Sequence, residues 1–165
     1  MTDYNIKLGR GTYALILRAR SAERVRIGAL GHLRMHSGAY VYVGSAFGPG
    51  GVRARVKHHL SRSPAPHWHI DYLRPATELD QVWYTHDPVR REHAWADLFC
   101  GTRGAVIPMR GFGASDCRCV SHLFYFESPP HFSTSRRRMK REMLGSEVLR
   151  WARRTHRRRE VLHPR

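Results

Sequence analysis

The chain has 165 residues and a formal net charge of +16, from 29 Lys and Arg against 13 Asp and Glu. This length predicts one domain with an appendage and excludes two full domains. The excess of positive charge is typical of proteins that bind a polyanion. Because 41% of the residues are hydrophobic, there is material for a core, and a globally disordered chain is excluded.

The cysteines and the apolar runs indicate where the protein resides. Cys100, Cys117 and Cys119 are an odd number, and two of them are too close in sequence for an ordinary disulfide, which predicts a reducing compartment. No basic start precedes an apolar run, and no stretch of 18 apolar residues occurs. We therefore expect a cytoplasmic protein with no secretion signal and no membrane span.

Three strands are predicted near the start, over 13–18, 24–27 and 39–43, with turn residues between them. We expect them to form an antiparallel meander. In the third strand, the period of two places Tyr40 and Tyr42 on one face and Val41 and Val43 on the other.

A glycine-rich loop, 48–51, leads into a helix predicted over 52–60, where apolar residues recur every four positions. Arg55 and His59 are also four residues apart and share a neighbouring face of that helix.

Four further elements follow: a helix over 67–73, a strand over 81–85, a helix over 89–99, and a strand over 122–126 after a glycine-rich loop. Glu92 lies at the edge of the apolar stripe of the second of these helices, and its neighbours Arg90 and Arg91 offer it an ordinary charge pair. The alternation predicts an α/β (α+β) domain over residues 1–127, with a small central antiparallel sheet flanked by helices.

Residues 128–165 are predicted to form a basic helical C-terminal extension. More than half of the net positive charge falls after residue 135. Leu144, Val148 and Trp151 have the i, i+4, i+7 spacing of an amphipathic helix. Such a helix either docks by its apolar stripe and is otherwise solvated, or also contacts phosphates.

Several motifs occur in a fixed order along the chain. Gly11-Thr12-Tyr13 stands on the first strand, Tyr42-Val43-Gly44 on a later one, Arg55 and His59 on the next helix, and Glu92 on a second helix. This set resembles the GIY-YIG nuclease superfamily. Longer blocks at 48–51, 67–72 and 111–122 resemble its small stand-alone branch of Uri-type endonucleases, so the resemblance covers roughly residues 10–127.

The resemblance implies a metal-dependent endonuclease that hydrolyses phosphodiester bonds. Glu92 would hold one Mg²⁺ or Mn²⁺, Arg55 would bind the scissile phosphate, and Tyr13 and Tyr42 would line the site near the attacking water. A free tyrosine has a pKa near 10, so a tyrosine base would need help from the metal, Arg55 or His59. Which group takes the proton stays open.

DNA is the expected substrate, with branched or damaged DNA in repair as one option, and the protein would then associate with the nucleoid. Trp68 could stack on a base. The candidate nucleic-acid-binding residues are Arg53, Lys57, His67, Trp68, His69, Arg136, Arg137 and Arg138.

The chain departs from the pattern of the superfamily in three places. The gap between Tyr13 and Tyr42 is long, which predicts an extra hairpin between the two motif strands. Thr12 stands where the family name has isoleucine. The asparagine that many members carry late in the domain has no clear match, and Asp116 or Ser121 could replace it.

A zinc site is a further option. Cys117, Cys119 and His122 give three donors, and His67 or His69 could be the fourth. The one-residue spacing of the cysteines is tighter than usual, so a polar loop with a buried thiol is the favoured interpretation. Two other functions stay open: a non-catalytic nucleic-acid-binding module, and a zinc-stabilised adaptor.

Overall fold

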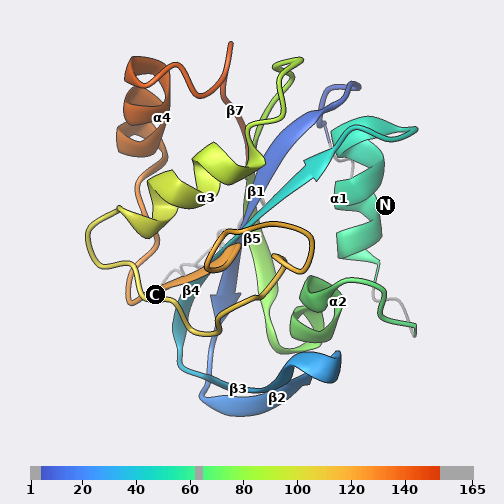
Figure 1. The fold of residues 1–165 in the computed structure, drawn as a ribbon, viewed down its shortest axis with the longest axis vertical. Helices are drawn as coiled ribbons and strands as arrows, with labels where there is room; N and C mark the ends of the chain where they lie inside the picture. Colours follow the sequence, from blue (N-terminus) through green and yellow to red (C-terminus); the bar gives the residue numbers. More distant parts are fainter. Residues whose placement is uncertain (1–4, 62–64, 153–165) are drawn as a thin grey trace, which may run out of the picture.

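The computed structural model describes residues 5–61 and 65–152. In this part of the chain, helices cover both faces of a five-stranded sheet whose strand order is β6-β4-β1-β5-β7 and whose pairs are all antiparallel (Figure 1). The strands are β1 (Gly11–Ala19), β4 (Gly38–Ala46), β5 (Glu78–Thr85), β6 (Leu123–Phe126) and β7 (Leu149–Ala152). The prediction of a small antiparallel sheet flanked by helices is confirmed.

Two hydrophobic cores form, one on each face of the sheet. Helices α1 (Gly51–Leu60) and α2 (His69–Leu73) cover the face that carries Tyr40 and Tyr42. Helices α3 (Glu92–Cys100) and α4 (Phe132–Arg141) cover the face that carries Val41 and Val43. The period-two assignment of the third predicted strand is therefore confirmed.

The first three strands do not form a meander. β1 pairs directly with β4 along its whole length, from Gly11 opposite Ala46 to Ala19 opposite Gly38. β2 (Glu23–Ile27) and β3 (Gly31–Met35) form a separate two-stranded sheet, with a short 3-10 turn between them. β1 is buried on both faces, whereas β2 has exposed charged residues that do not suit a central position. The extra hairpin between the two motif strands is confirmed.

Helix α3 begins at Glu92 and not at residue 89 as predicted. Asp87 accepts a hydrogen bond from the backbone N–H of Val89 and pairs with Arg91, which holds the preceding segment in a turn. The Thr12 hydroxyl accepts the N–H of Arg91, just before the helix (3.0 Å). Thr12 thus links β1 to the start of α3.

Helix α2 begins at His69, two residues later than predicted, because the Asp71 carboxylate accepts the backbone N–H groups of His67 and Trp68 as a cap. It is followed by a 3-10 turn over Arg74–Ala76.

The C-terminal part differs from the predicted extension. Its helix, α4, ends at Arg141, and the helix predicted across Leu144, Val148 and Trp151 is wrong. Met143 has a left-handed backbone (φ 54°), which stops the helix, and the chain then returns to the sheet as β7 beside β5. Residues 153–165, with their arginines, lie outside the described residues. No helix in the described ranges is both long and apolar enough to span a bilayer.

Candidate active site

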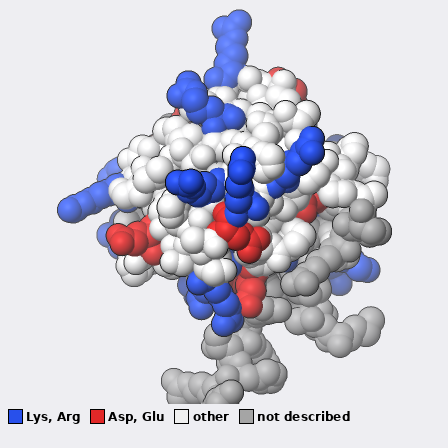
Figure 2. Space-filling view, turned by 90° about the horizontal axis from the view of Figure 1, so that it is seen from below, with Lys and Arg blue, Asp and Glu red and all other residues white. Residues whose placement is uncertain are grey.

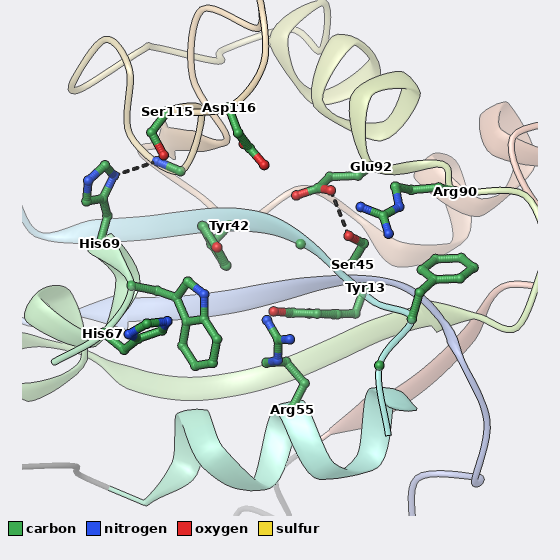
Figure 3. A pocket seen from close by; sticks show the side chains of 15 residues that line it. Tyr13, Tyr42, Ser45, Arg55, His67, His69, Arg90, Glu92, Ser115 and Asp116 are labelled. Carbon is green, nitrogen blue, oxygen red and sulfur yellow. Dashed lines mark hydrogen bonds between the residues drawn. The ribbon is translucent and has the colours of Figure 1, made fainter. Parts of the chain in front are cut away.

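A cavity of about 420 Å³ opens where β1, β4, α1, the start of α3 and the loop after α3 meet (Figure 3). It brings together residues that are far apart in the sequence. The predicted site residues that line it are Tyr13, Tyr42, Arg55, His67, Trp68, His69 and Glu92.

The sheet register explains why the motifs Gly11-Thr12-Tyr13 and Tyr42-Val43-Gly44 belong together. Tyr13 on β1 faces Gly44 on β4 as its cross-strand partner. A Cβ at position 44 would stand 2.5 Å from the Tyr13 hydroxyl oxygen and 2.6 Å from its ring carbon Cζ. The Tyr13 ring therefore lies over Gly44, and only a glycine leaves room for it. Tyr42, two residues earlier on β4, lies on the same face.

A buried hydrogen bond joins Tyr13 to helix α1. Its hydroxyl lies 2.8 Å from His59 Nε2, and both residues are 1% exposed. Burial lowers the pKa of His59, which keeps the ring neutral, and burial raises the pKa of Tyr13 well above its ordinary value. His59 does not itself line the cavity, and its hydrogen bond to the cavity lining is the one to Tyr13.

Asp71 lies behind this pair. Its Oδ1 is 3.6 Å from His59 Nδ1, which favours a proton on Nδ1 and leaves Nε2 free to accept the Tyr13 hydroxyl proton. Burial acts to raise the pKa of Asp71, but the nearby His59 ring, and hydrogen bonds from the backbone of Trp68 and His67 and from His58, lower it overall. Asp71 therefore stays a carboxylate.

Arg55 enters the cavity from α1 and stacks on Trp68, with its guanidinium carbon 4.3 Å from the ring centroid. Its N–H groups are donors suited to a phosphate oxygen. Trp68 is half-buried in this stack and in contacts with His58 and His67. It forms one wall of the cavity.

Glu92 enters from the opposite wall, as the first residue of α3. Its Oε2 accepts a hydrogen bond from the Ser45 hydroxyl at 2.7 Å, and its Oε1 lies 3.2 Å from His122 Nδ1. Burial acts to raise its pKa, but the contacts with His122 and Ser45 lower it overall, so Glu92 is ionised. Neither neighbouring arginine pairs with Glu92: Arg91 pairs with Asp87, and Arg90 lies over the Phe47 ring.

The donor chemistry of this wall fits a hard divalent cation. Glu92 offers a carboxylate in the cavity, and Asp116, from the loop after α3, lines the same space. Mg²⁺ and Mn²⁺ bind through one or two carboxylates and complete their shells with water. Asp116, one of the two residues considered in place of the missing asparagine, therefore lies in the site. Ser121, the other, bonds to the backbone of Leu123 instead.

Other residues of the cavity were not predicted. Arg90 adds a second cation, and its place two residues before Glu92 in the sequence was the available signal. The remaining ones include Gly44, Ser45, Phe47, Gly113 and Ser115.

Several candidate nucleic-acid-binding residues lie outside the cavity. Arg53 and Lys57 are exposed on α1, and Arg136 and Arg137 are exposed on α4. Arg138 pairs with Glu142 and donates to the backbone oxygen of Leu98, so it fastens α4 to α3. On the face seen from below, Lys and Arg side chains project at separate points with acidic side chains among them, and do not form one continuous patch (Figure 2).

Two of the cysteines, Cys117 and Cys119, lie in a cluster that reaches Glu92 through His122. Cys117, Cys119, His122 and His93 bring one donor atom each to within 4.8 Å of one another. The prediction of His67 or His69 as the fourth donor is wrong, because His93 takes that place in the cluster. His69 Nδ1 instead accepts the N–H of Gly113. All three cysteines are free, and burial together with Cys117 raises the pKa of the Cys119 thiol.

Comparison with known proteins identifies a family whose description assigns no function. No curated protein and no solved structure matches the chain. One family model, described as "Domain of unknown function DUF123", matches residues 12–144, from β1 to just beyond α4. Because this match covers most of the chain, the protein belongs to the DUF123 family.

Proposed function

We propose that the protein is a divalent-metal-dependent endonuclease that hydrolyses phosphodiester bonds in DNA, with the fold and mechanism of GIY-YIG nucleases. The observation that carries the proposal is the arrangement of one cavity: the Arg55 guanidinium on one wall, the ionised Glu92 carboxylate on the other, and the Tyr13–His59 hydrogen bond beside them. Phosphoryl transfer requires mainly positioning and charge neutralisation, which these groups supply.

Arg55 binds the scissile phosphate in this proposal. Its guanidinium is held on the Trp68 ring, so its donors are directed before the substrate arrives. Glu92 holds the cation, which supplies positive charge for the leaving oxygen. Arg90, on the same side as Glu92, adds charge that attracts the DNA backbone.

The Tyr13–His59–Asp71 arrangement supports a proton relay. The raised pKa of Tyr13 makes a free tyrosinate unfavourable. A concerted transfer avoids it: as the water oxygen attacks phosphorus, Tyr13 takes the proton of the water and gives its own proton to His59 Nε2. The imidazolium that forms faces the Asp71 carboxylate, which stabilises it. Tyr42, which lines the same cavity, contributes a hydroxyl to the placement of the water.

The test is cleavage of labelled plain duplex, single-stranded, flapped and four-way-branched DNA with Mg²⁺, Mn²⁺ or EDTA. We expect metal-dependent cutting by the native chain and its loss in Glu92→Gln. Glu127→Gln is the matched control, because this exposed glutamate lies outside the cavity. The preferred DNA would identify the substrate class.

The same experiment tests the alternative, a nucleic-acid-binding module that does not cleave. This alternative is favoured by the net charge of +16, which does not depend on the cavity. Equal, salt-sensitive binding by the native chain and Glu92→Gln, with no cutting of any substrate, would refute the nuclease and support the module.

A further inference from the structure

Four soft donors gather next to the cavity without being part of it. His93 comes from α3, Cys117 and Cys119 from the loop between α3 and β6, and His122 from the residue before β6. Their donor atoms all lie within 4.8 Å of one another. Side chains that can bind a metal thus bring together α3, the start of β6 and the long loop between them.

The spacing of these atoms approaches that of a tetrahedral metal site. With Zn–S bonds of about 2.3 Å and Zn–N bonds of about 2.0–2.1 Å, a tetrahedron places sulfur and nitrogen about 3.6 Å apart and two sulfurs about 3.8 Å apart. Cys117 Sγ lies 3.5 Å from His122 Nε2. The other donors need to close by no more than about 1.5 Å to reach this geometry.

We propose that Cys117, Cys119, His122 and His93 bind one structural Zn²⁺ ion. Thiolate and imidazole donors select zinc over Mg²⁺, which prefers oxygen, so this site and the Glu92 site take different metals. Four protein ligands leave no open position, which is typical of structural and not of catalytic zinc.

The surroundings of His122 support the proposal. This ring is 1% exposed, with Nε2 toward Cys117 and Nδ1 3.2 Å from Glu92 Oε1. Zinc-ligating histidines commonly present their second nitrogen to a carboxylate, which fixes the tautomer and the ring orientation. Zinc on Nε2 would leave the proton on Nδ1, the nitrogen that lies near Glu92. Glu92 would thus be held by Ser45 on one side and by a metal-bound histidine on the other.

The loop explains why a metal is useful here. Residues 101–122 contain turns and bends but no helix or strand in the structure, apart from one isolated bridge at Val106. A zinc ion would tie this loop to α3 through Cys117 and Cys119. It would thereby also fix Asp116, which directly precedes Cys117 and lines the cavity.

The first experiment measures the zinc content of the full chain, purified under reducing conditions and dialysed against a weak chelator. We expect about one zinc per chain in the native protein, and well below one in Cys117→Ser, Cys119→Ser and His93→Ala. Cys100→Ser and His32→Ala are the matched controls, because these exposed residues lie outside the cluster, and they should keep the full zinc content.

The second experiment needs no variant and therefore does not depend on how the variants fold. Cobalt is exchanged for zinc in the native chain, and we expect thiolate-to-cobalt charge transfer together with the visible bands of tetrahedral Co²⁺. A folded native chain with neither zinc nor this spectrum would overturn the proposal. Zinc retained in the cysteine variants but lost in Glu92→Gln would also overturn it, because the metal would then lie in the cavity.

Neither readout depends on DNA cleavage. A chain that binds zinc as described but cuts no substrate would refute the proposed function and leave the zinc site standing.

Discussion

Replacing Gly44 by alanine is expected to displace Tyr13. The added Cβ would lie 2.5 Å from the Tyr13 hydroxyl oxygen and 2.6 Å from Cζ, whereas van der Waals contact requires about 3.5 Å. The hydroxyl end of the ring must therefore move by about 1 Å. Tyr13 is 1% exposed and packed on all sides but the cavity, so a shift of this size strains or breaks the 2.8 Å bond to His59.

Two magnitudes follow from this displacement. Overpacking a buried site destabilises a protein by about 1–3 kcal/mol. Where a strand has room for the methyl group, a glycine-to-alanine change instead stabilises the protein by about 0.4–1 kcal/mol. A lower free energy of unfolding in Gly44→Ala would therefore indicate the clash, and a higher one its absence. A misplacement of about 1 Å in a catalytic group lowers the rate by about 100-fold, so we expect kcat/KM for cleavage to fall by that factor.

Gly48→Ala is the control. Gly48 lines the same cavity, but nothing lies within 4 Å of the Cβ it would gain. Urea denaturation measures the stability of both variants, and single-turnover cleavage measures the chemical step. A Gly44→Ala protein as stable as Gly48→Ala, with cleavage within twofold of the native chain, would refute the reasoning. The stability comparison holds even if the chain cuts no DNA.

Three other predictions concern Arg55 and the two residues behind Tyr13, His59 and Asp71. Asp71→Asn should lower the free energy of unfolding at pH 7 by about 1–3 kcal/mol. Because the native carboxyl has a lowered pKa, its contribution to stability is present above about pH 4 and is lost as the pH falls further. Urea titrations at several pH values should therefore show a weaker acid dependence in the variant. His59→Gln should slow cleavage and remove the acid limb of the pH–rate profile. In the native chain this limb should lie below pH 6.5, because burial lowers the His59 pKa. A limb unchanged by the substitution would exclude the relay. Arg55→Lys should reduce cleavage by about 10- to 100-fold, since lysine offers neither the bidentate fork nor the stack on Trp68, while Arg53→Lys should have little effect; equal effects would place the phosphate elsewhere.

Local patterns predicted the elements that carry the cavity. The period of two in 39–43 gave the correct faces of β4, and the four-residue spacing of apolar residues in 52–60 gave α1 with Arg55 beside His59. These predictions succeed because the burial of one face is encoded in neighbouring residues.

Tertiary contacts account for what was missed. The spacing of Leu144, Val148 and Trp151 suits a helix, but pairing with β5 overrides it in residues 149–152. His93 joins the cysteine cluster only because α3 packs beside the loop that follows it, and sequence spacing does not show this. Thr12, a departure from the superfamily pattern, accepts a hydrogen bond just before Glu92, which nothing in its local sequence indicates.

The position of β7 bears on how the chain should be shortened. The family match ends at residue 144, but the sheet continues to Ala152, and β7 covers the outer side of β5. A chain cut at the end of the match would leave the backbone N–H and C=O groups along β5 without partners. β5 would then be the edge strand, and it is longer than β7 and mostly buried in the full chain, so we expect such a fragment to aggregate more readily than a chain that keeps residues 145–152.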